Sequence, residues 1–376
     1  MNLLIIKPKT SRFEKLGYIL LAFLVVTNGI CNYLFGEFIS EGLALGATLI
    51  FFITKIRFNL LRHLIVPALV VILFIVISLI IIIYSNEWAR ALFLYPYFFF
   101  LALLLIPAYK QKYCTDNSFL ITTFIVFAFI SSCYALAQRY GIMTILPLEN
   151  EIRATGLSRS SLNLTGCLLA IFGMGVFSIK DSYKKLAILS IVFLGILAAG
   201  GRGGIISSLI LLSLAYFKKI KNISFLILLI LLSCVIFLFS ADWFLRSFGA
   251  FNFVSDQSNI DRVHSYLIFF DKFEFLGKGV GTTSPAAQRF LEATGFESSM
   301  LNAAYETGIP FIILMILAGF IWYRNLYGRS KKLIFMFFLS LLPVIAGQQL
   351  FGIPSAFCVL MITVYVLTSY RESIIL

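Results

Sequence analysis

Apolar segments recur along the whole chain, and most come close to the ~20 residues that a helix needs to cross a bilayer. Backbone polar groups find no water inside a bilayer, so only helices and closed barrels span it. Segments this long and continuously apolar predict helices. The twelve segments cover residues about 16–34, 39–54, 63–84, 89–108, 118–137, 161–178, 185–199, 203–217, 222–240, 301–322, 333–348 and 353–370.

The expected fold class is therefore all-α: a polytopic transmembrane helix bundle of about twelve spans, forming a single integral membrane domain over residues 1–376. Composition agrees, because only 12% of the residues are charged, against about 25% in soluble domains. The net charge of +13 is spread in short runs between apolar segments. This distribution is typical of membrane topology signals and argues against nucleic acid as a partner.

Several kinds of site are not expected. The six cysteines are scattered without a CxxC pair, which favours free thiols over a disulfide framework or a zinc site. The sequence has no HExxH, no GxSxG and no Walker GK[ST] motif. We therefore expect neither a metal ion nor a cofactor.

Basic residues between the apolar segments predict the orientation. An even number of spans places both termini on one side, and 20 of the 30 Lys and Arg residues fall in connections on that side. Because cytoplasmic connections carry the excess of positive charge, we expect both termini in the cytoplasm. The long polar stretch 241–300, between spans nine and ten, is then a large loop on the outer side of the membrane. The first apolar segment lacks a convincing small-residue cleavage site, so we expect it to be retained as a span.

Arginines on the outer side run against this charge rule and need another explanation. Arg202 stands in the turn AAGGRGG before the eighth span, and Arg153 and Arg159 lie in the polar stretch 138–163. A guanidinium can bind phosphate through two parallel hydrogen bonds, and flanking glycines let a ligand approach the backbone. The alternatives are an anchor among lipid headgroups for Arg202 and ion pairs with nearby acids for outer arginines in general.

The long loop contains a second group of candidates. Asp261 is placed to cap a helix that begins at Arg262, and the aromatic residues that follow suit an amphipathic helix at the outer membrane interface. Arg262 is either a second phosphate clamp or the ion-pair partner of Asp261 or Asp256. His264 is the only outer histidine and a candidate base.

Lys278 stands among Gly277, Gly279 and Gly281. Successive backbone N–H groups in such a stretch can form a concave nest that binds an anion. The alternative is a flexible turn, which glycines also favour.

A polar face marks the start of the tenth span. Ser298, Asn302 and Glu306 recur every four residues and so share one side of a helix. Such a face lines a cavity or contacts another helix. Glu297 precedes it, either as a first-turn acid stabilised by the helix dipole or as a general base that takes a proton from a sugar hydroxyl.

Four of these features together resemble the O-antigen polymerase and ligase group of bacterial membrane enzymes, the Wzy-type polymerases and WaaL-type ligases. They are the twelve-span plan, the GRGG turn with Arg202, the outer loop with Arg262 and a later LGKGVG, and a helix start of the form x-S-S-x-L-N-x-x-x-E-x-G. The ligases typically have His-Asn at the first two positions of the last motif, where this chain has Glu297 and Ser298. That departure is more like the polymerases.

The resemblance implies glycosyl transfer on the periplasmic face of the bacterial inner membrane. A glycan on undecaprenyl diphosphate, the donor, would pass to the end sugar of a second lipid-linked repeat unit, the acceptor, without metal or cofactor. Membrane lipid and a chain-length regulator are the further partners that it suggests. On this basis Arg202, Arg262 and Glu297 are assigned to catalysis. The residues assigned to substrate binding are Arg153, Arg159, His264, Lys278, Ser298, Asn302 and Glu306.

Two other functions remain open. The first is an O-antigen ligase, which would transfer the glycan to lipid A core. The second, from another class, is a flippase or transporter of lipid-linked oligosaccharide. A transporter usually has repeated halves and charged residues at mid-membrane, whereas the ionisable residues here fall at span ends and in one outer loop.

Overall fold

The computed structural model describes residues 11–55, 62–85, 88–105, 117–142, 146, 153–178, 183–216, 257–283, 296, 298–326, 328–347 and 353–369. Over these residues the protein is helical, with no β-strand. The helices are α1 (Arg12–Val26), α2 (Asn28–Phe35), α3 (Glu37–Lys55), α4 (Arg62–Tyr84), η1 (Trp88–Leu94), α5 (Tyr95–Leu105), α6 (Ser118–Arg139), α7 (Ser161–Ser178), α8 (Tyr183–Ala199), α9 (Arg202–Tyr216), α12 (Gln257–Lys272), α14 (Ser299–Arg324), α15 (Gly328–Gly347) and α16 (Pro354–Thr368).

Helices lie on eleven of the twelve predicted apolar segments, and the remaining segment, 222–240, falls outside the described residues. Five described helices are long and apolar enough to cross a membrane: α3, α4 from Leu64, α6, α7 and α14. The pair α1 and α2 counts as a sixth if it is one bent span. The all-helical, membrane-embedded character is thus confirmed for the described part of the chain, while the count of twelve spans stays a prediction.

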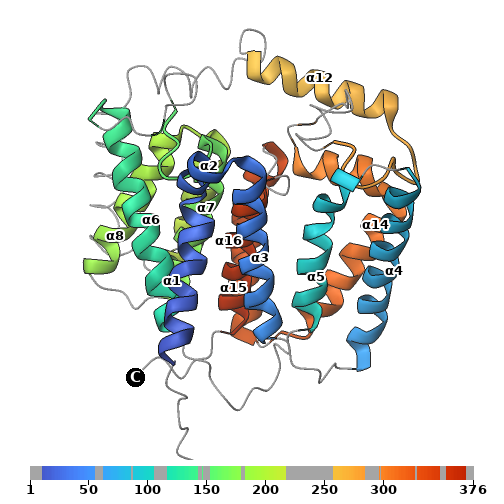
Figure 1. Ribbon diagram of the computed structural model, residues 1–376, viewed down its shortest axis with the longest axis horizontal. Helices are drawn as coiled ribbons and strands as arrows, with labels where there is room; N and C mark the ends of the chain where they lie inside the picture. The colour runs from blue at the N-terminus through green and yellow to red at the C-terminus, as the bar shows by residue number, and fades with distance from the viewer. Residues whose placement is uncertain are drawn as a thin grey trace, which may run out of the picture.

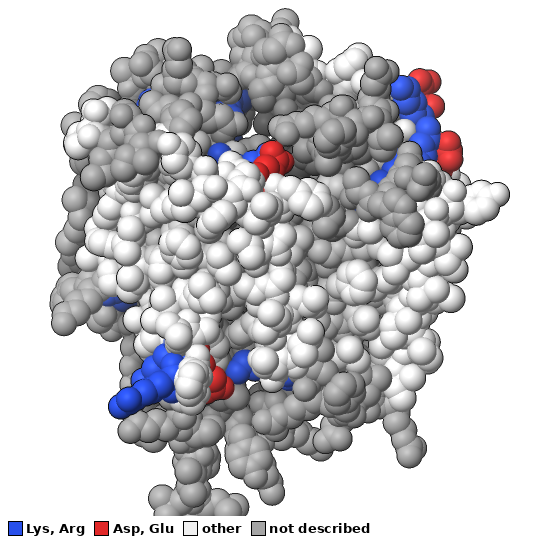
Figure 2. All heavy atoms as spheres, in the orientation of Figure 1, with Lys and Arg blue, Asp and Glu red and all other residues white. Residues whose placement is uncertain are grey.

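The helices stand side by side, with α1 beginning and α16 ending at the same end of the bundle (Figure 1). Helix α12 lies across the opposite end, which we call the α12 end. On the face drawn in Figure 2, most described charged side chains gather near these two ends and leave a broad band with little charge between them. Such a band matches the hydrocarbon region of a bilayer, where charged side chains are costly.

The core is built around α7 and α16. Residues 355–368 of α16 are all buried, and so is 83% of the apolar stretch of α7. Small residues let their neighbours come close: a Cβ added to Gly173 would lie 2.5 Å from the Phe337 ring. Close packing of small residues supplies much of the attraction between helices in lipid, where the hydrophobic effect is absent. The four cysteines in the described ranges are free thiols, as expected.

The first predicted segment is a bent pair of helices rather than one straight span. Helices α1 and α2 meet at a bend of 74°. The loop before α7 packs into this bend, where the Gly29 N–H donates to Leu157 O at 3.0 Å and the Ser158 hydroxyl donates to Val26 O at 3.2 Å. Glycine is needed here because a Cβ on Gly29 would lie 2.4 Å from the Ser158 carbonyl oxygen.

The tenth predicted segment also differs from a straight helix. Helix α14 breaks at Gly308, whose φ of 74° and ψ of 166° are not helical. Figure 1 shows the piece before the break running along the α12 end and the piece after it descending through the bundle. Pro310 follows the break, where its missing N–H costs nothing because the first turn of a helix leaves that donor unpaired.

Helix α12 begins earlier than the sequence predicts. It starts at Gln257, so Asp261 and Arg262 lie inside it and the predicted cap at Asp261 is wrong. No Gly or Pro stands between Gln257 and Asp261 to stop the helix from extending. Phe269 of α12 packs on Phe296, with ring centroids 5.7 Å apart. This contact ties α12 to the region around the start of α14, while its placement at a membrane interface stays a prediction.

Candidate functional site

Arg202 is the first residue of α9 and is half-buried. Gly200, with φ of 69°, turns the chain between α8 and α9. A Cβ on Gly203 would lie 3.1 Å from a backbone oxygen of α15, and one on Gly204 would lie 2.2 Å from the methyl group of Thr165 in α7. A turn and close helix packing therefore explain three of the glycines around Arg202 without a ligand.

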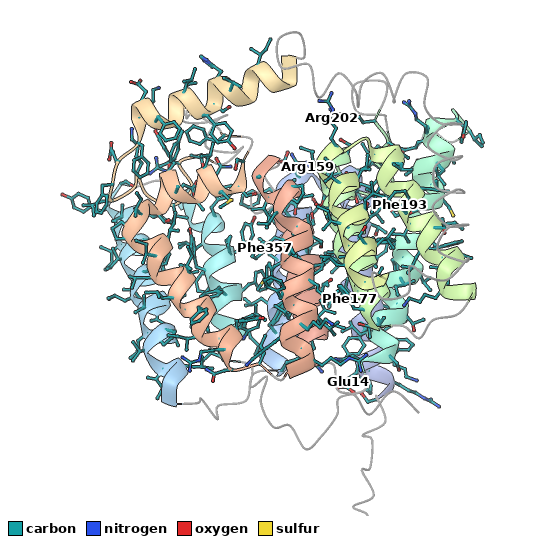
Figure 3. All side chains as sticks on the ribbon, turned by 180° about the vertical axis from the view of Figure 1, so that it is seen from behind. Glu14, Arg159, Phe177, Phe193, Arg202 and Phe357 are labelled. Atoms are coloured by element: carbon teal, nitrogen blue, oxygen red, sulfur yellow. The ribbon has the colours of Figure 1, made fainter. Side chains whose placement is uncertain are left out.

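The structure brings three of the predicted arginines to neighbouring segments at the α12 end. Figure 3 labels Arg202 and Arg159 at this end of the bundle. The loop before α7, which carries Arg153 and Arg159, is joined to the last turn of α8 by a hydrogen bond from Ala154 N–H to Ala198 O at 3.1 Å. Arg202 begins α9 shortly after this turn. The hydrogen bond therefore holds the loop with Arg153 and Arg159 next to the segment that leads into Arg202.

Arg159 is shared between two carboxylates of α3. Its guanidinium lies 2.5 Å from Glu37 Oε1 and 4.0 Å from Glu41 Oε1. The Glu37 side chain is 43% exposed and that of Glu41 only 11%. For Arg159, the ion-pair interpretation is confirmed, and a substrate anion would have to compete with these acids.

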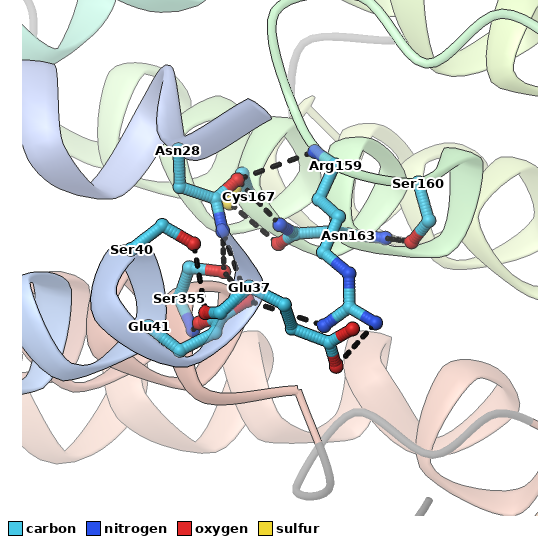
Figure 4. Close-up of polar contacts among 9 residues, drawn as sticks. All are labelled: Asn28, Glu37, Ser40, Glu41, Arg159, Ser160, Asn163, Cys167 and Ser355. Carbon is cyan, nitrogen blue, oxygen red and sulfur yellow. Dashed lines mark hydrogen bonds and ion pairs between the residues drawn. The ribbon is translucent and has the colours of Figure 1, made fainter. Parts of the chain in front are cut away.

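A buried polar cluster lies beneath Arg159 (Figure 4). Asn28 of α2 is at its centre: its amide nitrogen donates to Glu41 at 3.0 Å and to the Ser355 hydroxyl at 2.8 Å. Its amide oxygen accepts from the side-chain amide of Asn163 in α7 at 2.8 Å and from the backbone N–H of Arg159 at 3.3 Å. The cluster therefore links α2, α3, α7, α16 and the loop before α7.

Glu41 is a residue that our sequence reasoning missed. Its carboxylate accepts from the Ser355 N–H at 3.1 Å in the first turn of α16, where unpaired N–H groups and the helix dipole favour an anion. The signal was present, because Glu41 is the only charged residue in the predicted span 39–54. An ionisable residue inside a span is a functional or structural candidate by default.

A second polar cluster forms around Glu306 of α14. Its carboxylate accepts from the Thr283 N–H at 3.0 Å and the Thr283 hydroxyl at 2.6 Å, and also from the Gly281 N–H. Arg90 of η1 lies against the same turn, since a Cβ on Gly281 would come within 3.0 Å of the Arg90 side chain. Glu306 of the protein itself therefore occupies the backbone donors at residues 281–283, at the end of the glycine turn.

The first half of that glycine turn is held by the backbone of α14. Lys278 N–H donates to Tyr305 O and Gly279 N–H to Glu306 O, both at 2.9 Å. Both sequence interpretations of this stretch therefore need correction: the two N–H groups already have partners, and the turn is fixed to its neighbour. The physical reason is that the break in α14 leaves carbonyl groups without helical partners, and the turn supplies donors to them.

Lys278 itself is exposed. Its Nζ lies 3.4 Å from Glu274 and 5.2 Å from the centre of the Tyr305 ring. A side-chain hydrogen bond with Tyr305 and the neighbouring Glu274 carboxylate raise the pKa of the Lys278 amine, so it is charged at neutral pH. His264 on α12 is also exposed.

Ser298 and Asn302 hold the start of α14. The Ser298 hydroxyl caps the helix by accepting from the Leu301 N–H at 3.5 Å. The Asn302 amide makes two bonds with the backbone of Phe296, accepting from its N–H at 3.2 Å and donating to its carbonyl at 2.9 Å. Among the described residues, neither a cavity nor a contact with another helix is seen at these two side chains, because both are bonded to the backbone at the start of α14 itself.

Two of the three residues assigned to catalysis, Glu297 and Arg262, are described only in part or not at all. Glu297 lies outside the described residues, although Phe296 and Ser298 on either side of it are described. For Arg262 the backbone is described as part of α12, and its side chain is not. Within the described ranges, no group of three His, Cys, Asp or Glu residues could hold a metal ion.

Comparison with known proteins adds no assignment to this geometry. No family model matches the chain, and no curated protein matches it in sequence.

Proposed function

We propose that the protein is a membrane glycosyltransferase that polymerises undecaprenyl-diphosphate-linked repeat units into O-antigen or a related surface polysaccharide. The observation that carries the proposal is the joining of the loop with Arg153 and Arg159 to the turn before Arg202, through the Ala154–Ala198 hydrogen bond at the α12 end. The segments that carry Arg153, Arg159 and Arg202 are thereby gathered at one end of an apolar bundle. An anionic headgroup whose lipid tail stays in the bilayer would meet them there.

The chemistry of the proposal is a displacement at the anomeric carbon of the donor. A hydroxyl of the acceptor sugar attacks that carbon, the bond from the carbon to the diphosphate oxygen breaks, and the hydroxyl proton passes to a base. The diphosphate leaves with the bonding electrons. Arg202 and Arg262 would stabilise the negative charge that develops on it, and Glu297 would accept the proton.

Arg202 is the better of the two arginines to test first, because the structure describes both its backbone and its side chain. Lysine keeps the charge but loses the planar pair of donors that grips a diphosphate. We therefore expect Arg202→Ala to abolish long polysaccharide chains and Arg202→Lys to retain at most a small fraction of them. Arg324→Ala, at the opposite end of the bundle, is the matched control and should leave chain length unchanged.

The test is deletion of the gene in its host, complemented with each variant, with polysaccharide resolved by length on a gel and protein level measured in the membrane. Lipid A core capped with a single repeat in the deletion strain supports a polymerase. Long chains stranded on the carrier lipid would indicate a ligase, and single repeats confined to the cytoplasmic leaflet a flippase. Normal ladders with Arg202→Ala would refute the assigned role of that residue.

A further inference from the structure

The starting observation is the way the glycine turn crosses the break in α14. Three backbone hydrogen bonds connect the turn to the broken helix: Lys278 N–H to Tyr305 O, Gly279 N–H to Glu306 O, and Ile309 N–H to Phe275 O. They measure 2.9, 2.9 and 3.1 Å. The carbonyl and N–H groups released by the break are therefore paired with the turn instead of with water or lipid.

The turn and the broken helix also approach each other closely at a glycine on each side. A Cβ on Gly277 would lie 2.5 Å from the Gly308 nitrogen, and a Cβ on Gly308 would lie 2.4 Å from the Leu276 carbonyl carbon. Both glycines have a positive φ. No other residue type fits this contact without moving backbone, so the turn and the break are built as one unit.

We define the α12–α14 module as α12, residues 273–283, Phe296 and residues 298–308. Its apolar centre is Phe269, Phe296 and Tyr305. Its polar fastening is the carboxylate of Glu306, which reaches from α14 to the Gly281 and Thr283 N–H groups and the Thr283 hydroxyl. Thr283 is buried, with 1% of its surface exposed, so the fastening is protected from competing water.

This module contains the backbone of Arg262 and both chain neighbours of Glu297. Arg262 lies within α12, as the sixth of its 16 residues. Glu297 stands in the chain between Phe296, which Asn302 holds by two hydrogen bonds, and Ser298, which caps α14. The position of α12 relative to the start of α14 therefore sets where the backbone of Arg262 lies with respect to both chain neighbours of Glu297.

We propose that Glu306 is a positioning residue that fastens α12 and its turn to the start of α14, and so fixes the position of α12 relative to Phe296 and Ser298, the chain neighbours of Glu297. This inference rests on the proposed function for its catalytic consequence, though not for the fastening itself. A carboxylate suits the role because it only accepts hydrogen bonds, and all three groups around it are donors. A glutamine would direct amide hydrogens at some of those donors.

The first arm of the test measures the fastening without reference to activity. Hydrogen–deuterium exchange is followed by mass spectrometry on the full chain in detergent, for the wild type and for Glu306→Gln and Thr283→Val. Valine keeps the shape of threonine and has a methyl group in place of the hydroxyl. Thr283→Ser keeps the hydroxyl and is the matched control. We expect faster exchange over residues 273–283 in Glu306→Gln and Thr283→Val, near wild-type exchange in Thr283→Ser, and no change in α7 or α16.

The second arm measures catalysis with purified lipid-linked repeat units in detergent micelles. A misplacement of about 1 Å between reacting groups costs on the order of a hundredfold in rate. We therefore expect kcat of Glu306→Gln to fall by roughly ten- to a hundredfold while KM for the donor changes by less than about twofold. Thr283→Ser should recover most of kcat.

The outcomes separate the two claims. Unchanged exchange over residues 273–283 in both Glu306→Gln and Thr283→Val would overturn the fastening, whatever the activity. A large rise in KM with unchanged kcat would show that Glu306 binds the sugar directly and would overturn the positioning role. Absence of polymerisation by the wild-type protein, with the exchange result as expected, would count against the proposed function and leave the fastening established.

Discussion

Glu41 and Glu306 are two acids in apolar helices that use the same device in different surroundings. Each carboxylate accepts a backbone N–H and a hydroxyl from one distant residue, Ser355 for Glu41 and Thr283 for Glu306. Glu41 joins α3 to α16, which is almost entirely buried. Glu306 joins a helix to a turn on α14, of whose apolar stretch only 28% is buried inside the protein.

The difference shows what a carboxylate can stabilise at a membrane boundary. In the Glu41 cluster, removing the acid weakens the contacts of α3 with α2, α16 and the loop before α7 at once, because Asn28, Ser355 and Arg159 all contact its carboxylate. In the Glu306 cluster, the backbone bonds of the turn remain when the acid is removed. We therefore expect global destabilisation in the first case and local opening in the second.

The largest effect should come from Glu41→Ala. It leaves the buried Ser355 N–H without its carboxylate acceptor, which typically costs about 1–3 kcal/mol, and it removes the charged acceptor of the Asn28 amide, which costs about 1.5–3 kcal/mol more. Glu37→Ala is the matched control, because it removes the more exposed partner of the same arginine and should cost at most about 1 kcal/mol. Thermal unfolding in detergent measures both, and equal losses would contradict a special role for Glu41.

The next largest effect should come from the contact between the glycine turn and the break in α14. Gly277→Ala and Gly279→Ala replace glycines of similar positive φ, 79° and 97°. A Cβ on Gly277 would lie 2.5 Å from the Gly308 backbone nitrogen, whereas nothing lies within 4 Å of a Cβ on Gly279. Both variants carry backbone strain of about 1–2 kcal/mol, and the clash should add a further 1–3 kcal/mol in Gly277→Ala alone.

Limited proteolysis of the turn gives the readout for this pair. We expect rapid cleavage within residues 273–283 in Gly277→Ala and slower cleavage in Gly279→Ala. Equal protection of the two variants would mean that the contact between the glycines does not hold the turn.

The smallest change in stability should come from Gly204→Ala, where α9 packs against α7. Gly204→Ala places a methyl group 2.2 Å from a methyl of Thr165, an overpacking that typically costs about 1–3 kcal/mol and is partly relieved if Thr165 rotates. Gly46→Ala in α3 is the control, since nothing lies within 4 Å of its added Cβ and the better helix propensity should stabilise by about 0.5–1 kcal/mol. Opposite shifts in melting temperature are the expected result, and a gain in both would show that α7 and α9 pack loosely.

Much of the helical plan follows from the apolar segments, because a bilayer allows the backbone of a spanning segment few conformations besides a helix. The two bends do not follow from it. The bend between α1 and α2 depends on the loop before α7, and the break in α14 depends on the turn at residues 275–279. Gly308 followed by Pro310 was a visible signal for the second break. The first had none of comparable strength, since Gly29 became informative only once Ser158 lay against it.

By itself, the sequence determined that this is a helical membrane protein, and that arginines cluster in a few polar connections, because both depend on local composition and on the cost of charge in lipid. Only the tertiary structure decided which polar groups are already satisfied. Arg159 binds acids of α3 and its N–H meets Asn28, 131 positions away in the chain. Hydrogen bonds act over about 3 Å, so such pairings depend on how the helices pack, which no local pattern records.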